Sequence, residues 1–154
     1  MLRREFLIGT LALAAFPTSS FAFPDTLIVN RTETCGCCGV WVERMNSAGL
    51  RTEVNYVDEE ALGLIKTQLG ISNELSSCHT ATIGSYSIEG HVPAEDIFKL
   101  LTERPNARGL SVPGMPIGSP GMEMGNNKEP FDTLLVLENG KTQVFNSHSQ
   151  PPSV

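Results

Sequence analysis

Three cysteines stand close together in the segment TETCGCCGVWVERM, residues 32–45. Cys35 and Cys38 have the spacing of a thiol–disulfide redox pair. Cys37 lies between them, where a redox pair needs no thiol, and as a soft thiolate it would suit Cu(I) or Zn²⁺. Structural disulfides are a weaker interpretation, because cysteines this close in sequence close only short loops. The segment therefore leaves a redox site and a metal site as the main hypotheses.

The fourth cysteine, Cys78, lies far along the chain in the segment SSCHTATI, and His79 follows it directly. A histidine in this place is either a further metal ligand or an ordinary hydrogen-bonding residue, and both interpretations of His79 stay open. The other two histidines, His91 and His148, are interpreted as surface residues, because one precedes a predicted helix and the other lies near the C-terminus.

Three of the five methionines, Met115, Met122 and Met124, lie in VPGMPIGSPGMEM, outside any apolar stripe. Thioether sulfur is a soft ligand that suits Cu(I). Packing of this segment onto the core is the favoured alternative, since methionine fills irregular gaps well. Met115 and Met122 are the better placed of the three to approach the cysteines. Trp41, one turn after the cysteines, either shields them or belongs to the core.

The segments that carry these residues predict alternating strands and helices. Strands are predicted at 25–30, 51–57, 80–83 and 86–89, and helices at 39–48, from Asp58 to a stop at Gly70, and from Pro93 onward. Apolar residues recur at helical spacing, and the predicted inner faces are Trp41, Met45 and Ala48, then Leu62, Ile65 and Leu69, then Ile97, Leu100 and Leu101. Gly84-Ser85 has the composition of a two-residue hairpin turn.

The resulting order, β-α-β-α-β-β-α, favours an α/β or α+β sheet covered by helices. With a cysteine motif between the first strand and the first helix, this order is by analogy that of the thioredoxin-like fold. In that fold the loop before the third strand abuts the active cysteines. We therefore expect Cys78 to approach Cys35, Cys37 and Cys38.

Beyond this core, residues 105–130 hold five prolines and five glycines and predict a long Pro/Gly/Met loop without regular structure. Two strand-like runs at 133–145, around Asn139-Gly140, predict a C-terminal β-hairpin. The predicted domain therefore spans 23–146, and residues 147–154 are expected to form a flexible tail.

The N-terminus has the pattern of an export signal. Two arginines precede a short apolar run at 7–16, and small residues at 20–22 predict cleavage after Ala22, which removes residues 1–22. The segment RREFL also resembles the twin-arginine motif, and the choice between that route and Sec export stays open. No other stretch is long and apolar enough to cross a membrane. The formal net charge of −6 argues against a nucleic-acid partner.

Four motifs resemble the CopG-like periplasmic copper-resistance proteins: CGCCG after the first strand, SCHTA before the third, EGHVPAEDI, and the long VPGMPIGSPGME. The resemblance runs from Asp25 to Phe145. It implies a thioredoxin-like domain in the periplasm that holds one or more Cu(I) ions on cysteines, namely Cys35, Cys37, Cys38 and Cys78. It also implies a role in copper homeostasis alongside other periplasmic copper-handling proteins, and it leaves copper redox conversion open.

Two functions from different classes follow. The first is a copper-binding protein, which would lose Cu(I) affinity in Cys37→Ser and Cys78→Ser. The second is a thiol–disulfide oxidoreductase in which Cys35 attacks and Cys38 resolves, and such an enzyme would tolerate both changes. A structural zinc domain is a third interpretation, and it would unfold on chelation.

Overall fold

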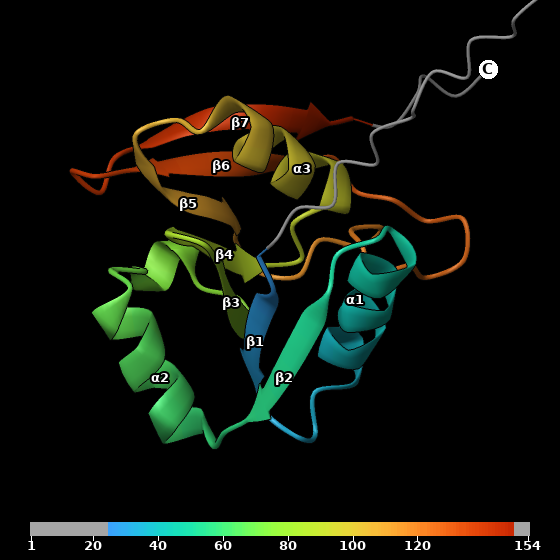
Figure 1. Cartoon of the computed structure of the whole chain (residues 1–154). Coiled ribbons are helices and arrows are strands. Elements are labelled where there is room, and N and C mark those ends of the chain that lie inside the picture. The colour runs from blue at the N-terminus through green and yellow to red at the C-terminus, as the bar shows by residue number, and fades with distance from the viewer. Residues whose placement is uncertain (1–24, 150–154) are drawn as a thin grey trace, which may run out of the picture.

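The computed structural model describes residues 25–149, so the predicted signal peptide at 1–22 and its cleavage site lie outside the described residues. One seven-stranded mixed sheet, in the order β2-β1-β3-β4-β5-β6-β7, runs through the molecule (Figure 1). Neighbouring strands are antiparallel except for the parallel pairs β1–β2 and β4–β5. The strands are β1 (Leu27–Arg31), β2 (Thr52–Tyr56), β3 (His79–Ile83), β4 (Tyr86–Gly90), β5 (Ala107–Val112), β6 (Phe131–Leu137) and β7 (Thr142–His148). The predicted α/β fold class is confirmed.

Helices cover both faces of the sheet. α1 (Gly36–Ser47) and α3 (Ala94–Glu103) pack into one core, and α2 (Glu59–Gln68) lies across the sheet from α1 (Figure 1). Asp58 caps α2 as predicted, because its carboxylate accepts a hydrogen bond from the Ala61 N–H at 2.8 Å. A short 3₁₀ turn, η1 (Asn73–Leu75), leads from α2 towards β3. Within residues 25–149, none of the helices is long and apolar enough to cross a membrane.

The hydrophobic core contains the predicted inner faces of α1 and α3. Trp41 and Met45 of α1 are buried there together with the apolar face of α3, which comprises Ile97, Leu100 and Leu101. Ala48, predicted to share this face, is exposed because α1 has ended and the chain turns at Gly49, where φ is 98°. Leu50, directly after the turn, is the buried residue.

The first four strands lie side by side in the order β2-β1-β3-β4, as in the thioredoxin-like fold that we expected by analogy. Gly84 and Ser85 form the expected two-residue turn between β3 and β4. Because β3 runs antiparallel to β1, its first residue, His79, pairs with Arg31, the last residue of β1. The loop that leaves β1 and the loop that enters β3 therefore meet at the same end of the sheet.

The predicted loop at 105–130 is wrong in its first part, where β5 forms an interior strand of the sheet. Arg108 and Gly109 interrupt the apolar pattern of this strand, which is why the sequence did not indicate it. Glycine is required at 109, since a side chain there would collide with the backbone of Ser87 on β4. The irregular segment is therefore shorter, residues 113–130.

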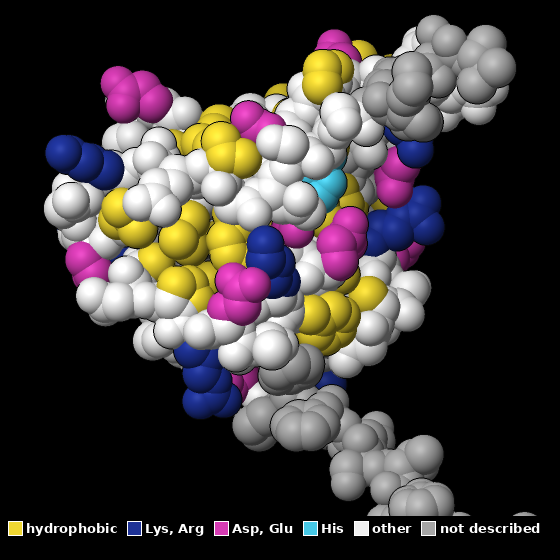
Figure 2. Space-filling model, turned by 90° about the horizontal axis from the view of Figure 1, so that it is seen from above, with side chains coloured by type: hydrophobic (Ala, Val, Ile, Leu, Met, Phe, Trp, Pro, Cys, Tyr) yellow, Lys and Arg dark blue, Asp and Glu magenta, His cyan; other side chains and the backbone are white. Residues whose placement is uncertain are grey.

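β6 and β7 form the predicted hairpin around Asn139-Gly140. β7 runs to His148, past the predicted boundary at 146. The prediction of His148 as a surface residue is wrong, because its Nε2 lies 2.8 Å from Oδ2 of Asp96 and its ring stacks on Phe131 with centroids 4.6 Å apart. Seen from above, the visible face carries hydrophobic side chains among charges of both signs, so neither sign dominates it (Figure 2).

Candidate metal centre

The CGCCG segment forms the start of α1. Cys35 is the N-cap residue, and Cys37 and Cys38 lie in the first turn, close to the backbone N–H groups that a helix N-terminus leaves unpaired. These groups favour a thiolate over a neutral thiol. Cys38 is fully buried, whereas Cys35 and Cys37 are half-buried. Solvent therefore has access to two of the three residues.

Gly39, directly after the cysteines, makes room for a buried cation. A Cβ atom at position 39 would lie 2.8 Å from Nη1 of Arg31. Arg31 donates from Nε to the Thr32 carbonyl at 3.1 Å and from Nη2 to the Glu33 carbonyl at 3.2 Å. The guanidinium group thus fixes the loop that leads into Cys35.

Cys78, in the loop between η1 and β3, contacts the cysteines of α1. Its Sγ lies 3.8 Å from Sγ of Cys37 and 3.5 Å from Sγ of Cys38. Sγ of Cys35 lies 3.5 Å from Sγ of Cys37. All four sulfur atoms lie within 4.8 Å of one another. The structure therefore brings the four cysteines into one cluster, here called the sulfur centre (Cys35, Cys37, Cys38 and Cys78).

In this structure the sulfur centre is partly oxidised. Cys35 and Cys38 are joined by a disulfide, while Cys37 and Cys78 are free thiols. A disulfide does not supply thiolate ligands, so four-thiolate metal binding requires two-electron reduction of this bond. The arrangement can therefore support either metal binding or thiol–disulfide chemistry, depending on its redox state.

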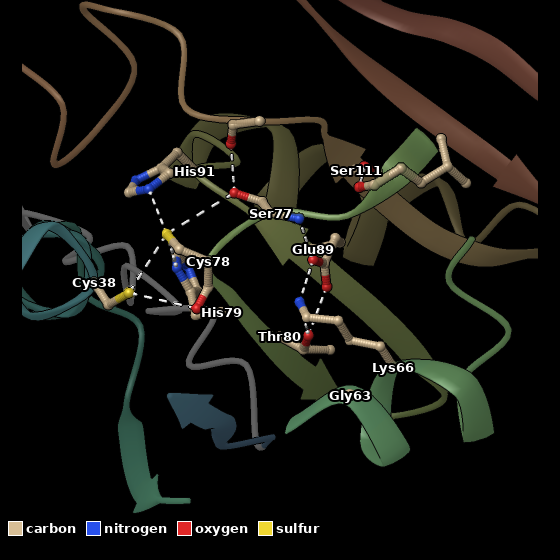
Figure 3. A network of polar contacts seen from close by, with 12 residues as sticks. Cys38, Gly63, Lys66, Ser77, Cys78, His79, Thr80, Glu89, His91 and Ser111 are labelled. Carbon is tan, nitrogen blue, oxygen red and sulfur yellow. Dashed lines mark hydrogen bonds and ion pairs between the residues drawn. The ribbon is translucent and has the colours of Figure 1, made fainter. Parts of the chain in front are cut away.

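His91, which follows β4, is the residue that sequence reasoning missed. It is fully buried rather than on the surface, and its Nε2 lies 3.1 Å from Sγ of Cys78 (Figure 3). Its Nδ1 lies 2.8 Å from the carbonyl oxygen of Pro120, which can only accept, so Nδ1 carries the proton. Burial lowers the pKa of His91, so the imidazole is neutral and the Nε2 lone pair faces the sulfur. In the sequence, the only sign that His91 belongs to the site was its place in the family motif EGHVPAEDI.

His79, whose role the sequence left open, is also buried beside Cys78. Its Nδ1 lies 3.6 Å from Sγ of Cys78, and its Nε2 has no hydrogen-bond partner among the described residues. Burial lowers the pKa of His79 well below its ordinary value, and the charges of His91, Lys66 and Arg31 add to this effect. Cys78, His79 and His91 form a second group of donor atoms within 4.8 Å of one another.

The free thiol of Cys78 is held in its protonated form. Burial, as the main cause, and the charge and hydrogen bonding of the neighbouring Cys37 together raise its pKa from 9.0 to about 12. A metal ion with its positive charge would reverse this preference, because it binds the thiolate and displaces the proton.

The Pro/Gly/Met loop covers the start of α1. A Cβ atom at Gly121 would lie 2.7 Å from the carbonyl oxygen of Cys37 and 2.9 Å from the backbone nitrogen of Trp41, so only glycine allows this approach. Trp41 belongs to the core and also contacts His79, with ring centroids 4.4 Å apart. The indole therefore takes both roles that the sequence left open.

A cavity of about 700 Å³ opens beside the sulfur centre, between α2 and the loops. Cys35 and Cys78 line it together with Met115, whose side chain is 51% exposed. Met122 lies half-buried in the turn after Gly121, and Met124 is 59% exposed; neither lines this cavity. Of the three methionines, Met115 is the one that shares a cavity with the cysteines.

Comparisons with known proteins agree with this geometry. A family model described as "Protein of unknown function, DUF411" matches residues 75–122, the part of the chain with Cys78 and His91. No curated protein matches the chain. The solved structure "Copper resistance protein copG- Form 2" is 36% identical, with a TM-score of 0.76, over 82% of this chain and 99% of that chain. "Copper resistance protein copG- Form 1" is 35% identical, with a TM-score of 0.75, over 81% and 98%.

The fold and the site together define a thioredoxin-like domain with a cysteine–histidine centre at the start of its first helix. At this identity and coverage, the chain belongs to the CopG family of copper resistance proteins. The resemblance noted in the sequence is confirmed.

Proposed function

We propose that the protein is exported to the periplasm and binds Cu(I) there on the thiolates of the sulfur centre, as part of copper homeostasis. The observation that carries this proposal is the convergence of four cysteine sulfurs within 4.8 Å. Thiolates are soft donors that suit Cu(I), and sulfurs this close can bridge more than one ion. The copper resistance proteins to which the chain is similar support the choice of metal.

Two neutral imidazoles extend the donor set in this proposal. The lone pair of His91 Nε2 lies 3.1 Å from Sγ of Cys78, close enough for both atoms to bind one ion after a small shift. His79 Nε2 is a buried polar atom that lacks a partner among the described residues, which is costly unless something binds it. Of the two, His91 is the stronger candidate, because Pro120 already fixes its tautomer.

Loading begins with reduction of the Cys35–Cys38 disulfide in this proposal. A dithiol or another two-electron donor supplies two electrons, two protons complete the thiols, and Cu(I) then displaces protons as the thiolates bind. Copper passes to and from other copper-handling proteins by stepwise exchange of thiolates. The cavity lined by Cys35, Cys78 and Met115 is the route by which a donor or acceptor ligand approaches.

The direct test is an anaerobic Cu(I) titration of the reduced, signal-free protein against a chromophoric competitor, with metal analysis. We expect tight binding by the wild type and a loss of at least about tenfold in affinity for each Cys→Ser variant of the sulfur centre, a change that corresponds to about 1.4 kcal/mol. Met124→Leu is the matched control, since it removes an exposed thioether outside the cavity. Reduced protein that binds no Cu(I) would refute the proposal.

A second function, thiol–disulfide oxidoreductase, is favoured by one observation: Cys35 and Cys38 form a disulfide at the start of a helix. In this alternative an external thiolate attacks Cys35, the accessible sulfur, and Cys38 leaves. Turnover of a disulfide substrate would then depend on Cys35 and Cys38 but tolerate Cys37→Ser. Copper binding that needs Cys37, together with negligible turnover, decides against this alternative.

A further inference from the structure

The Cys78 loop, residues 76–78, belongs to no helix or strand, yet its backbone is held at several points. The Ser76 carbonyl accepts a hydrogen bond from the Gly114 N–H at 3.1 Å, and the Ser77 hydroxyl donates to the Gly114 carbonyl at 2.5 Å. Just before the loop, the carbonyl of Leu75 accepts a bond from the hydroxyl of Ser111 on β5 at 2.8 Å. These contacts hold the loop from the side of β5 but leave the Ser77 N–H to another partner.

That partner is Glu89, a carboxylate of β4 with a side chain only 1% exposed. Its Oε1 accepts a bond from the Ser77 N–H at 2.6 Å, and its Oε2 accepts one from the hydroxyl of Thr80 at 2.6 Å (Figure 3). The buried carboxylate of Glu89 thus binds Ser77, directly before Cys78, and Thr80, two residues after it. The cysteine is held from both sides by one side chain.

Lys66 of α2 neutralises this carboxylate. Its Nζ forms an ion pair with Oε1 of Glu89 and donates to Oγ1 of Thr80 at 2.8 Å (Figure 3). Its side chain is 12% exposed, so the pair lies almost entirely away from solvent. Lys66 also lines the cavity that contains Cys35 and Cys78. The network therefore joins α2, β3, β4 and the Cys78 loop.

Gly90 allows the loop to come this close to β4. It takes a φ of 73°, and a Cβ atom there would lie 2.5 Å from the Cβ of Ser77. A side chain at 90 would therefore push Ser77 away from Glu89. The sequence Glu89-Gly90 thus supplies both the acceptor for the loop and the space that the loop occupies.

We propose that the Lys66–Glu89 pair is a positioning device for Cys78, which sets the loop so that the Cys78 sulfur meets Cys37 and His91. For copper binding this inference rests on the proposed function, but the position of Cys78 does not. Neither Lys66 nor Glu89 donates to the metal in this proposal. They act through the backbone of Ser77 and through Thr80.

A buried ion pair is by itself weak evidence for any role, since two well-packed apolar side chains often stabilise a fold as well. An apolar pair could not accept the Ser77 N–H, and that donor would be buried without a partner. Only an acceptor at position 89 satisfies it, and a buried acceptor with full charge needs a cation beside it. The need to accept the Ser77 N–H therefore explains why position 89 carries a carboxylate and why a lysine lies beside it.

The first test uses no copper. In the oxidised protein, Cys37 and Cys78 are the two free thiols, so alkylation followed by peptide mass spectrometry gives a separate rate for each. Glu89→Ala should raise the ratio of the Cys78 rate to the Cys37 rate by about tenfold, the size expected when one charge-assisted hydrogen bond is lost. Glu89→Gln keeps an acceptor for the Ser77 N–H and should restore most of the wild-type ratio. An unchanged ratio in folded Glu89→Ala would overturn the proposal.

The second test is a double-mutant cycle on Cu(I) affinity in the reduced protein. Glu89→Ala should weaken Cu(I) binding by about tenfold when Cys78 is present and by less than about twofold in Cys78→Ser, because it acts through that sulfur. A purely structural role would give equal losses in both backgrounds, which would refute positioning. If the wild type binds no Cu(I), the proposed function fails, and the alkylation ratio still decides the inference.

Asp96→Ala is the matched control for both tests. Asp96 is also a buried carboxylate with three hydrogen-bond donors, and these are Thr133, Asn146 and His148. This variant should lower the unfolding temperature yet leave the alkylation ratio at the wild-type value. An equal rise of the ratio in Asp96→Ala and Glu89→Ala would mean that general loosening explains both, and the proposal would be abandoned.

Discussion

Two buried carboxylates, Glu89 on β4 and Asp96 on α3, are each 1% exposed and each accept hydrogen bonds from three groups. The donors to Glu89 are an ammonium group, a hydroxyl and a backbone N–H, and they come from α2, β3 and the Cys78 loop. The donors to Asp96 are all side chains of β6 and β7. Glu89 therefore fastens a loop, whereas Asp96 fastens two strands to a helix.

This difference separates two uses of the same chemical group. A carboxylate that binds only regular strands can stabilise the fold without any effect on a site. A carboxylate that holds the backbone next to a reactive side chain also sets where that side chain lies. Four changes test this distinction, and the first is the one for which we expect the greatest loss of stability.

Separation of the Lys66–Glu89 pair should have the largest effect. Lys66→Met leaves a buried carboxylate without its cation, and loss of one partner from a buried pair costs about 3–5 kcal/mol. Urea unfolding of the oxidised protein should report this loss. A decrease below about 1 kcal/mol would mean that solvent reaches Glu89 and that the pair contributes no more than an exposed ion pair does.

Asp96→Ala should cost less, because the three side chains that lose their acceptor include no lysine or arginine. Thr133, Asn146 and His148 lose a shared acceptor. Of the three only Thr133 is fully buried, and one buried group without a partner costs about 1–3 kcal/mol. Hydrogen exchange should show faster opening of β7, with β3 and β4 unchanged. Faster exchange in β3 instead would remove the contrast with Glu89.

The third change is a rise in pH, which tests the loop that Glu89 holds through the thiol of Cys78. Burial raises the pKa of Cys78 from 9.0 to about 12, so the folded protein keeps a proton that the unfolded chain loses. This contribution to stability is complete below pH 9.0 and is lost as pH rises towards about 12. Unfolding free energies of the oxidised wild type should thus fall more steeply over this range than those of Cys78→Ser. Parallel curves would contradict the pKa shift.

The smallest effect belongs to an exposed carboxylate, Glu123, which also holds a loop. Its Oε1 accepts a bond from Nε of Arg44 at 3.0 Å, and its Oε2 accepts one from the Gly121 N–H at 2.8 Å. Arg44→Ala should cost about 0.2–1 kcal/mol, as exposed ion pairs do, and the effect should vanish in high salt. A larger loss that does not depend on salt would mean that the Arg44–Glu123 pair behaves like the buried Lys66–Glu89 pair and not like an exposed ion pair.

Much of the fold follows from local patterns in the sequence. Helical spacing, the Asp58 cap and the Gly84-Ser85 turn predicted the elements of the thioredoxin-like core, and their order gave the arrangement. β5 could not be predicted, because Gly109 interrupts its apolar pattern. The reason for a glycine there, the close backbone of Ser87 on β4, is visible only in the folded structure. The end of β7 was missed for a similar reason, since contacts with α3 and β6 hold His148.

The candidate site divides in the same way. Cysteine spacing indicated the metal or redox chemistry of the α1 segment, and the fold analogy led us to expect Cys78 beside it. His91 was interpreted as a surface residue, because no local pattern indicates that the Pro120 carbonyl and the Cys78 sulfur lie on either side of its ring. Lys66 and Glu89 look like ordinary surface charges in the sequence, and only packing brings them together.

The pairing of Arg31 with His79 has a consequence for assembly of the molecule. Side chains alternate along a strand, so a slip of β3 by one residue against β1 would turn every side chain of β3 to the opposite face. Cys78 would then leave the α1 cysteines, and Thr80, which stays paired with Glu89 on β4, would turn away from Lys66 of α2. A chain in the wrong register would keep CGCCG but lack its fourth sulfur. The contact of Cys78 with the α1 cysteines therefore forms only when β1 and β3 are paired in the correct register.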